Sequence, residues 1–100
     1  MRVVIREAAF GDLERVFAWI AKDSPLAARS VIARIFDAID RLAEFPGLGH
    51  AGTVEGTREW VVRGLPYIIV YALDHERGAE LAPELLTVIA VFHGAQERDT

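Results

Sequence analysis

A segment rich in proline and glycine divides this 100-residue chain into two parts with different hydrophobic patterns. Residues 45–49 contain Pro46, Gly47 and Gly49, which are incompatible with a helix that continues through them. Up to Phe45, apolar residues recur at helical spacing, whereas after Gly56 they form short β-branched and aromatic runs. We therefore expect the helices to come first and most of the strands to follow.

Two amphipathic helices are predicted in the first part. The first covers residues 9–23, and its apolar face is formed by Leu13, Val16, Phe17 and Ile20. The second covers residues 25–44, because Ser24 is a favourable N-cap and Pro25 fits the first helical position. With so short a connection, the two helices should pair as an antiparallel hairpin.

The apolar stripe of the second helix includes Ile35 and Phe36. If this stripe is the core, replacing either residue with Ala should cost on the order of 2–5 kcal/mol.

Four strands are predicted, over residues 2–6, 58–63, 67–73 and 85–93. The last of these is apolar on both faces, so it should be central in its sheet. Residues 74–84 are polar and should form a loop, as should residues 45–56. The expected fold is α+β with the order β-α-α-β-β-β, a mostly antiparallel sheet covered on one face by a helical hairpin. The length of the chain suits a single domain over residues 1–100.

Composition narrows the classes of function. The chain has no cysteine and a net charge of −4, so disulfides and thiolate metal sites are excluded and non-specific binding to phosphate backbones is disfavoured. No apolar run approaches the roughly 20 residues that span a bilayer, and the N-terminus lacks the shape of a signal peptide. We expect a cytoplasmic protein without a metal or cofactor.

Four stretches, residues 12–20, 38–49, 56–71 and 88–96, together resemble the ParE branch of the RelE/ParE toxin superfamily. The resemblance implies a toxin that is encoded beside an antitoxin, here a ParD-like protein. ParE-like members inhibit DNA gyrase, whereas RelE-like members cut messenger RNA in the ribosome without a metal.

The chain departs from the ribonuclease branch at two places. Ile68 stands where that branch often has Arg, and Ala95-Gln96 stand where it has Arg or Lys; many ParE-like chains also have Arg at the position of Gln96. Alternation along the strand puts Tyr67 and Tyr71 on one face and Ile68 on the other. If the tyrosine face packs on the helices, the opposite face of this strand is apolar, which is unsuitable for cleaving a phosphodiester.

No catalytic residue is assigned from the sequence. Candidate partner contacts are Trp19, Arg58, Trp60, Arg63, His93, Gln96 and Arg98. Each has an alternative: Trp60 could pack in the core, Arg58 and Arg63 could be solvated strand-edge charges, and His93 could bond to nearby backbone and fix a turn.

Three functions remain open at this point. The chain could inhibit gyrase, cut messenger RNA on the ribosome, or bind its antitoxin without being toxic. Sequence-specific nucleic-acid binding is not expected. The antitoxin is expected to lay an amphipathic helix over the domain through apolar anchors and local contacts with arginines, and it could add a strand to the sheet.

Overall fold

The computed structural model describes residues 1–74 and 83–95 of the chain. Its elements are β1 (Arg2–Ile5), α1 (Glu7–Ala21), α2 (Pro25–Glu44), β2 (His50–Ala51), β3 (Arg58–Val61), β4 (Tyr67–Asp74) and β5 (Leu85–His93). The predicted α+β class and the predicted order are confirmed, with the two-residue β2 as an addition inside the segment expected to be loop.

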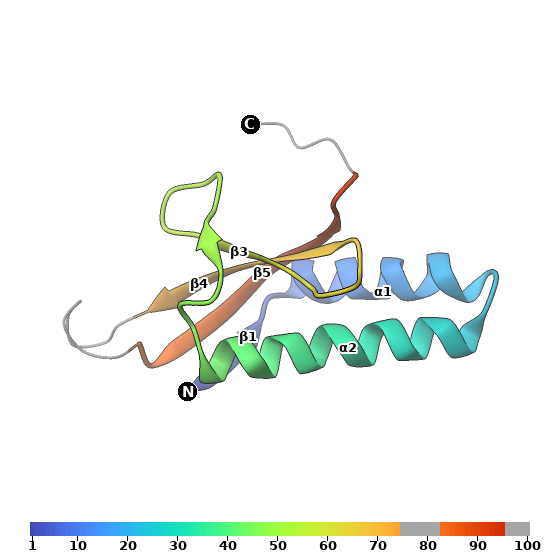
Figure 1. The fold of residues 1–100 in the computed structure, drawn as a ribbon, viewed down its shortest axis with the longest axis horizontal. Coiled ribbons are helices and arrows are strands. Elements are labelled where there is room, and N and C mark those ends of the chain that lie inside the picture. Colours follow the sequence, from blue (N-terminus) through green and yellow to red (C-terminus); the bar gives the residue numbers. More distant parts are fainter. Residues whose placement is uncertain (75–82, 96–100) are drawn as a thin grey trace.

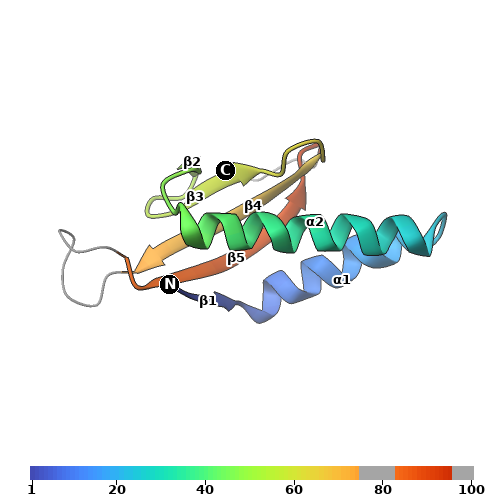
Figure 2. The same cartoon turned by 60° about the horizontal axis from the view of Figure 1, so that its bottom comes forward.

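The five strands form one mixed sheet in the order β1-β5-β4-β3-β2 (Figures 1 and 2). β1 pairs parallel with β5, and the other neighbours pair antiparallel. The last strand was expected to be central; β5 lies between β1 and β4, so it is paired on both sides, while the middle strand of the five is β4.

Both helices lie on one face of this sheet, side by side as a hairpin (Figure 2). α2 begins as predicted, with the backbone N–H of Ala27 donating to the Ser24 hydroxyl at 3.1 Å and Pro25 in the first turn. α1 begins at Glu7, two residues earlier than expected, and continues through Gly11. A single glycine costs a helix only about 1 kcal/mol, which the packing of this helix offsets.

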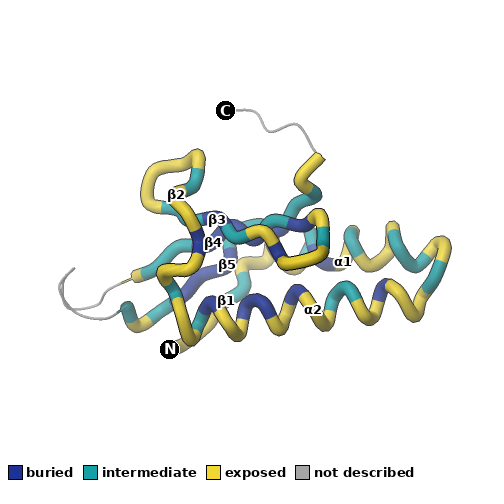
Figure 3. Tube along the Cα trace, in the orientation of Figure 1, coloured by how far each residue is buried: buried dark blue, intermediate teal, exposed yellow. Residues whose placement is uncertain are grey.

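The core lies between the hairpin and the sheet (Figure 3). Its largest fully buried side chains are Tyr71, Ile35, Ile39, Leu42, Ile69, Leu86 and Val88. Phe36 is not among them, since 37% of it is exposed, and the expectation that it belongs to the core as Ile35 does is wrong. Successive residues are turned by roughly 100° around a helix axis, which carries Phe36 to the margin of the buried stripe.

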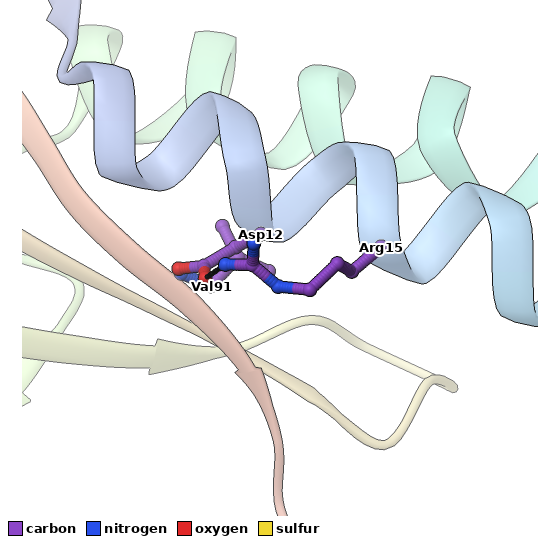
Figure 4. A network of polar contacts seen from close by, with 3 residues as sticks. All are labelled: Asp12, Arg15 and Val91. Carbon is purple, nitrogen blue, oxygen red and sulfur yellow. Dashed lines mark hydrogen bonds and ion pairs between the residues drawn. The ribbon is translucent and has the colours of Figure 1, made fainter.

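A side chain from α1 completes the hydrogen bonding of β5. The register of β4 and β5 shifts between Val70 and Tyr71, as at a β-bulge. Near this irregularity the backbone N–H of Val91 donates to Oδ2 of Asp12 at 2.9 Å, and Arg15 pairs with the other carboxylate oxygen (Figure 4). The bond fixes α1 against β5.

Among the residues described here, no helix is long and apolar enough to cross a membrane.

Candidate functional site

An open groove of about 390 Å³ lies between α2 and β3; we call it the α2–β3 groove. Its lining from α2 consists of Arg34, Asp37, Ala38 and Arg41. Its lining from the rest of the chain consists of Leu48, Trp60, Val62 and Arg63. The groove thus combines an apolar floor with three guanidinium groups and one carboxylate.

The register of β3 explains why its aromatic residue faces the helix. Trp60 pairs with Ile69, a core residue of β4, so both side chains project toward the helical layer. Trp60 is half-buried and packs against the core cluster. One part of Trp60 therefore packs on the core, as the structural alternative expected, and another part lines the groove.

One arginine is held in place at the end of the groove. Nη2 of Arg34 donates to the carbonyl oxygen of Arg63 at 2.7 Å. The following turn requires Gly64, whose φ of +77° is unfavourable for other residues, and a Cβ there would stand 2.8 Å from the same Nη2. The position of Arg34 thus depends on a glycine from the opposite side of the groove.

The wall that carries Leu48 is fixed by two side chains from the sheet. The hydroxyl of Tyr71 donates to the carbonyl oxygen of Pro46 at 2.8 Å and accepts from the backbone N–H of Gly49 at 2.9 Å. Arg58 donates to the carbonyl oxygens of Gly47 and Gly49, at 3.2 and 2.6 Å. Arg58 is therefore half-buried and bonded to the loop, and it is not a free strand-edge charge.

The face of the sheet away from the helices is mainly apolar. One cross-strand row consists of Val61, Ile68 and Phe92, and the next of Glu59, Val70 and Ala90. Tyr67 and Tyr71 belong to the helix-covered core. The sequence argument against cleavage of a phosphodiester assumed that the tyrosine face of this strand packs on the helices, and that assumption is correct.

Glu59 is the carboxylate in these two rows, and sequence analysis missed it. It is 7% exposed, and one of its oxygens accepts hydrogen bonds from the backbone N–H and the hydroxyl of Thr53, at 3.2 and 3.0 Å. The only sequence signal that could have indicated it is that Glu59 is the single acid in a strand of two charged and two apolar residues.

The candidate residues from the sequence are spread over several places. Trp60 and Arg63 meet in the α2–β3 groove. Trp19 lies near the end of α1, 69% exposed, with Nζ of Lys22 5.0 Å from its ring centre. Gln96 and Arg98 lie outside the described residues.

His93 ends β5 and has a structural role. Its Nδ1 accepts the backbone N–H of Ala95 at 3.0 Å, and its ring meets that of Tyr67 edge to face at 5.5 Å. An Nδ1 that accepts carries no proton. The ring thus bonds to nearby backbone at a turn, which is the structural alternative that the sequence offered for His93.

Sequence analysis also missed the α2 side of the groove. Arg34 and Arg41 are seven residues apart, which places them on one side of the helix two turns from each other. That spacing was a signal, but only the packing of α2 beside β3 makes it part of a groove. In the described part of the chain, no group of three or more His, Asp or Glu side chains is arranged to hold a metal ion.

Comparison with known proteins places the chain in a family. Residues 3–98 match the model of the ParE toxin of the type II toxin–antitoxin system parDE. A protein from Sinorhizobium fredii named "Putative toxin Y4kP" is 43% identical over 85% of this chain and 79% of its own length. Toxin RelE2 of Caulobacter vibrioides is 34% identical over 95% of this chain and 97% of its own length.

A solved structure has the same fold. A chain from the chromosomal ParDE system of P. aeruginosa superposes with a TM-score of 0.75, covering 93% of this chain and 95% of that one at 14% identity. The family match spans nearly the whole sequence, including both helices and all five strands. This chain is a member of the ParE toxin family of type II toxin–antitoxin systems.

Proposed function

We propose that this protein inhibits DNA gyrase, is not a ribonuclease, and is neutralised by a cognate ParD-like antitoxin. The observation that carries the choice between the two activities is the chemistry of the open sheet face. The row formed by Val61, Ile68 and Phe92 offers no cation, acid or base.

Metal-free cleavage of RNA needs a base for the 2′-hydroxyl, an acid for the leaving oxygen and cations for the charge that develops on the phosphoryl group. On the open face, Ile68 occupies the position at which the ribonuclease branch often carries Arg. Arg58 bonds to the loop on the other face, and Arg63 lines the α2–β3 groove. Losing one such cation can cost roughly 3–4 kcal/mol of transition-state stabilisation.

One observation supports the ribonuclease alternative. Glu59 stands on the open face beside His50, its partner in the register of β2 and β3. A carboxylate next to an imidazole is a plausible acid–base pair. Against this alternative, the carboxylate already accepts two hydrogen bonds from Thr53. One relative is also named as a RelE toxin, so both activities have to be tested.

The test uses the purified protein, separated from its antitoxin, in two assays. One follows supercoiling by gyrase and trapped DNA breaks, and the other follows messenger RNA on translating ribosomes. We expect loss of supercoiling with intact transcripts. Codon-specific cuts with normal supercoiling would overturn the proposal, and Glu59→Gln should then abolish them. No effect in either assay would favour a relative that binds its antitoxin without being toxic.

Three variants locate the inhibitory surface. Trp60→Ala removes the aromatic floor of the groove, Arg58→Ala releases the loop that carries Leu48, and truncation after Gly94 removes Gln96 and Arg98. Trp19→Ala is compared with Trp60→Ala, because it removes the chain's other candidate tryptophan from an exposed position on α1. The chain has two tryptophans, so the pair also reports which one a partner contacts.

A further inference from the structure

The α2–β3 groove gathers positive charge in an otherwise acidic chain. Three guanidinium groups line it, those of Arg34, Arg41 and Arg63, together with a single carboxylate, that of Asp37. Among the residues that the structure describes, the one ion pair lies elsewhere, on α1. The groove therefore has a local excess of two positive charges in a chain whose net charge is −4, and this excess favours a small, multiply charged anion.

Two of the cations come from opposite sides of the groove. Nη2 of Arg34 donates to the carbonyl oxygen of Arg63 at 2.7 Å, so the two residues are neighbours across it. This bond uses one of the five N–H donors that a guanidinium has, and the side chain of Arg63 also lines the groove. Guanidinium groups bind phosphate oxygens through paired N–H···O bonds. The end of the groove at Arg34 and Arg63 is therefore suited to a chain of phosphates.

Trp60 gives the same groove an aromatic surface. It is half-buried, with one part packed on the core cluster and another lining the groove above the buried Ala38 and Val62. An indole presents a flat face on which a nucleobase stacks. The volume of about 390 Å³ lies within the roughly 300–1,000 Å³ range of small-molecule clefts. The groove thus combines a stacking surface for a base with cations for phosphates.

The α2 side of the groove also carries an acceptor beside a donor. Asp37 and Arg41 are four residues apart, so they are neighbours on the surface of the helix. Guanine presents the O6 and N7 acceptors to which an arginine donates, and its adjacent N–H groups can donate to a carboxylate. Adenine has an amino donor at the position of O6, which faces an arginine unfavourably. The pair of Asp37 and Arg41 therefore favours guanine over adenine.

We propose that the α2–β3 groove of the free protein binds a guanine nucleotide with a di- or triphosphate. The base stacks on Trp60 with its polar edge at Asp37 and Arg41, and the phosphates lie at Arg34 and Arg63. The inference goes beyond the proposed function and is independent of it, because it rests on the lining of the groove alone. A nucleic-acid strand is disfavoured as the occupant, because the acidic chain repels a long polyanion.

The two tryptophans of the chain make this site directly observable. Trp19→Phe leaves Trp60 as the one fluorescent indole, and Trp60→Phe leaves Trp19, which is exposed on α1 and does not line the groove. Both variants, purified without antitoxin, are titrated with GTP, and the emission is corrected for absorption by the nucleotide. We expect saturable quenching in Trp19→Phe and a linear collisional response in Trp60→Phe. Equal responses of the two variants would overturn the groove as the site.

Two variants with the same change in charge test the phosphate contacts by calorimetry. Arg63→Gln removes a groove cation and keeps the carbonyl oxygen that Arg34 uses, whereas Arg29→Gln removes an exposed arginine of α2 that does not line the groove. We expect Arg63→Gln to weaken GTP binding by about tenfold or more and Arg29→Gln by less than about twofold, because a hydrogen bond to phosphate is lost in the first variant alone. Equal losses would overturn the phosphate assignment.

A second matched pair tests recognition of the base. The wild type should bind GTP at least about tenfold more tightly than ATP. Asp37→Asn should reduce this ratio to less than about threefold, and Asp40→Asn, which removes an exposed acid outside the groove, should preserve it. The ratio is the readout, because the removal of any acid raises the affinity for anions in general.

The wild-type measurements decide the proposal even if a variant unfolds, which urea midpoints detect. Equal affinities for GTP and ATP would overturn the guanine assignment. Inorganic triphosphate that binds as tightly as GTP would overturn the role of Trp60 and leave a nonspecific anion site. Absence of GTP binding would overturn the proposal as a whole, whereas the gyrase assay reports on the proposed function separately.

Discussion

At the scale of single residues, Tyr71 joins the two parts of the chain. Its ring is fully buried in the core, while its hydroxyl bonds to Pro46 and Gly49 in the segment that ends α2. A phenol gives both a large apolar surface and a donor–acceptor tip, which phenylalanine cannot do. The close approach also explains Gly49, because a Cβ there would stand 2.4 Å from the Tyr71 hydroxyl oxygen.

Tyr71→Phe should destabilise the protein by about 1–3 kcal/mol, because it leaves the buried N–H of Gly49 without its acceptor. The matched control is Tyr67→Phe, in which the aromatic ring is also retained in the core. Urea unfolding followed by circular dichroism measures both. A loss in Tyr71→Phe no larger than in Tyr67→Phe would show that the loop does not depend on this hydroxyl.

At the scale of elements, α1 is attached to the sheet by packing and by one charged hydrogen bond. The Asp12 carboxylate accepts the Val91 N–H near the register shift of β4 and β5 (Figure 4). A strand irregularity disrupts the ladder locally. Here the side chain of Asp12 supplies an acceptor for the Val91 N–H beside the irregularity, and this bond fixes the position of α1 along β5.

Asp12→Ala should therefore cost about 1–3 kcal/mol, the penalty for leaving a buried backbone donor unpaired. Glu14→Ala removes a carboxylate from the same helix at an exposed position, and it should change stability by less than about 0.5 kcal/mol. Thermal and urea unfolding of the two variants provide the comparison. Similar midpoints for both would contradict a specific role for the bond between Asp12 and Val91.

Ile35 and Phe36 are neighbours on α2 that differ in burial, so their replacement by Ala should differ in its cost to stability. Ile35→Ala should cost on the order of 2–5 kcal/mol, because the side chain is fully buried and its removal leaves a cavity. Phe36→Ala should cost clearly less, because 37% of Phe36 is already exposed to water. Denaturant midpoints rank the two variants, and a larger loss for Phe36→Ala would mean that the outer side of the hairpin is packed more tightly than an exposed fraction of 37% implies.

At the scale of the whole molecule, sequence pattern predicted the long elements and the helical hairpin on one face of the sheet, but not β2 or the full strand order. Periodicity located α2 to the residue, since Ser24, Pro25 and the Pro-Gly segment mark both of its ends. β2 was missed because His50–Ala51 is too short to show alternation and lies between two glycines. The parallel pairing of β1 with β5 and the position of α2 beside β3 depend on long-range packing, which local propensity does not encode.

The candidate site was predictable only in part for the same reason. Trp60 and Arg63 were identified by residue type, because aromatic and guanidinium groups dominate interfaces. Arg34 and Arg41 were not, although they complete the groove. Both line the groove because α2 packs beside β3, and Arg34 is also held by a hydrogen bond to the Arg63 carbonyl, which connects residues 29 positions apart in the sequence.

The shape of the molecule predicts where it opens first. The hairpin extends beyond the end of the sheet (Figure 2), and its connection is flanked by Trp19 and Leu26, which are 69% and 77% exposed. Segments with few buried contacts open locally without global unfolding. In native-state hydrogen exchange, the amides of residues 19–27 should therefore exchange much faster than those of residues 86–91 in β5, which has neighbours on both sides. Equal protection in the two segments would indicate that the hairpin tip and β5 open only together, in a single cooperative unfolding step.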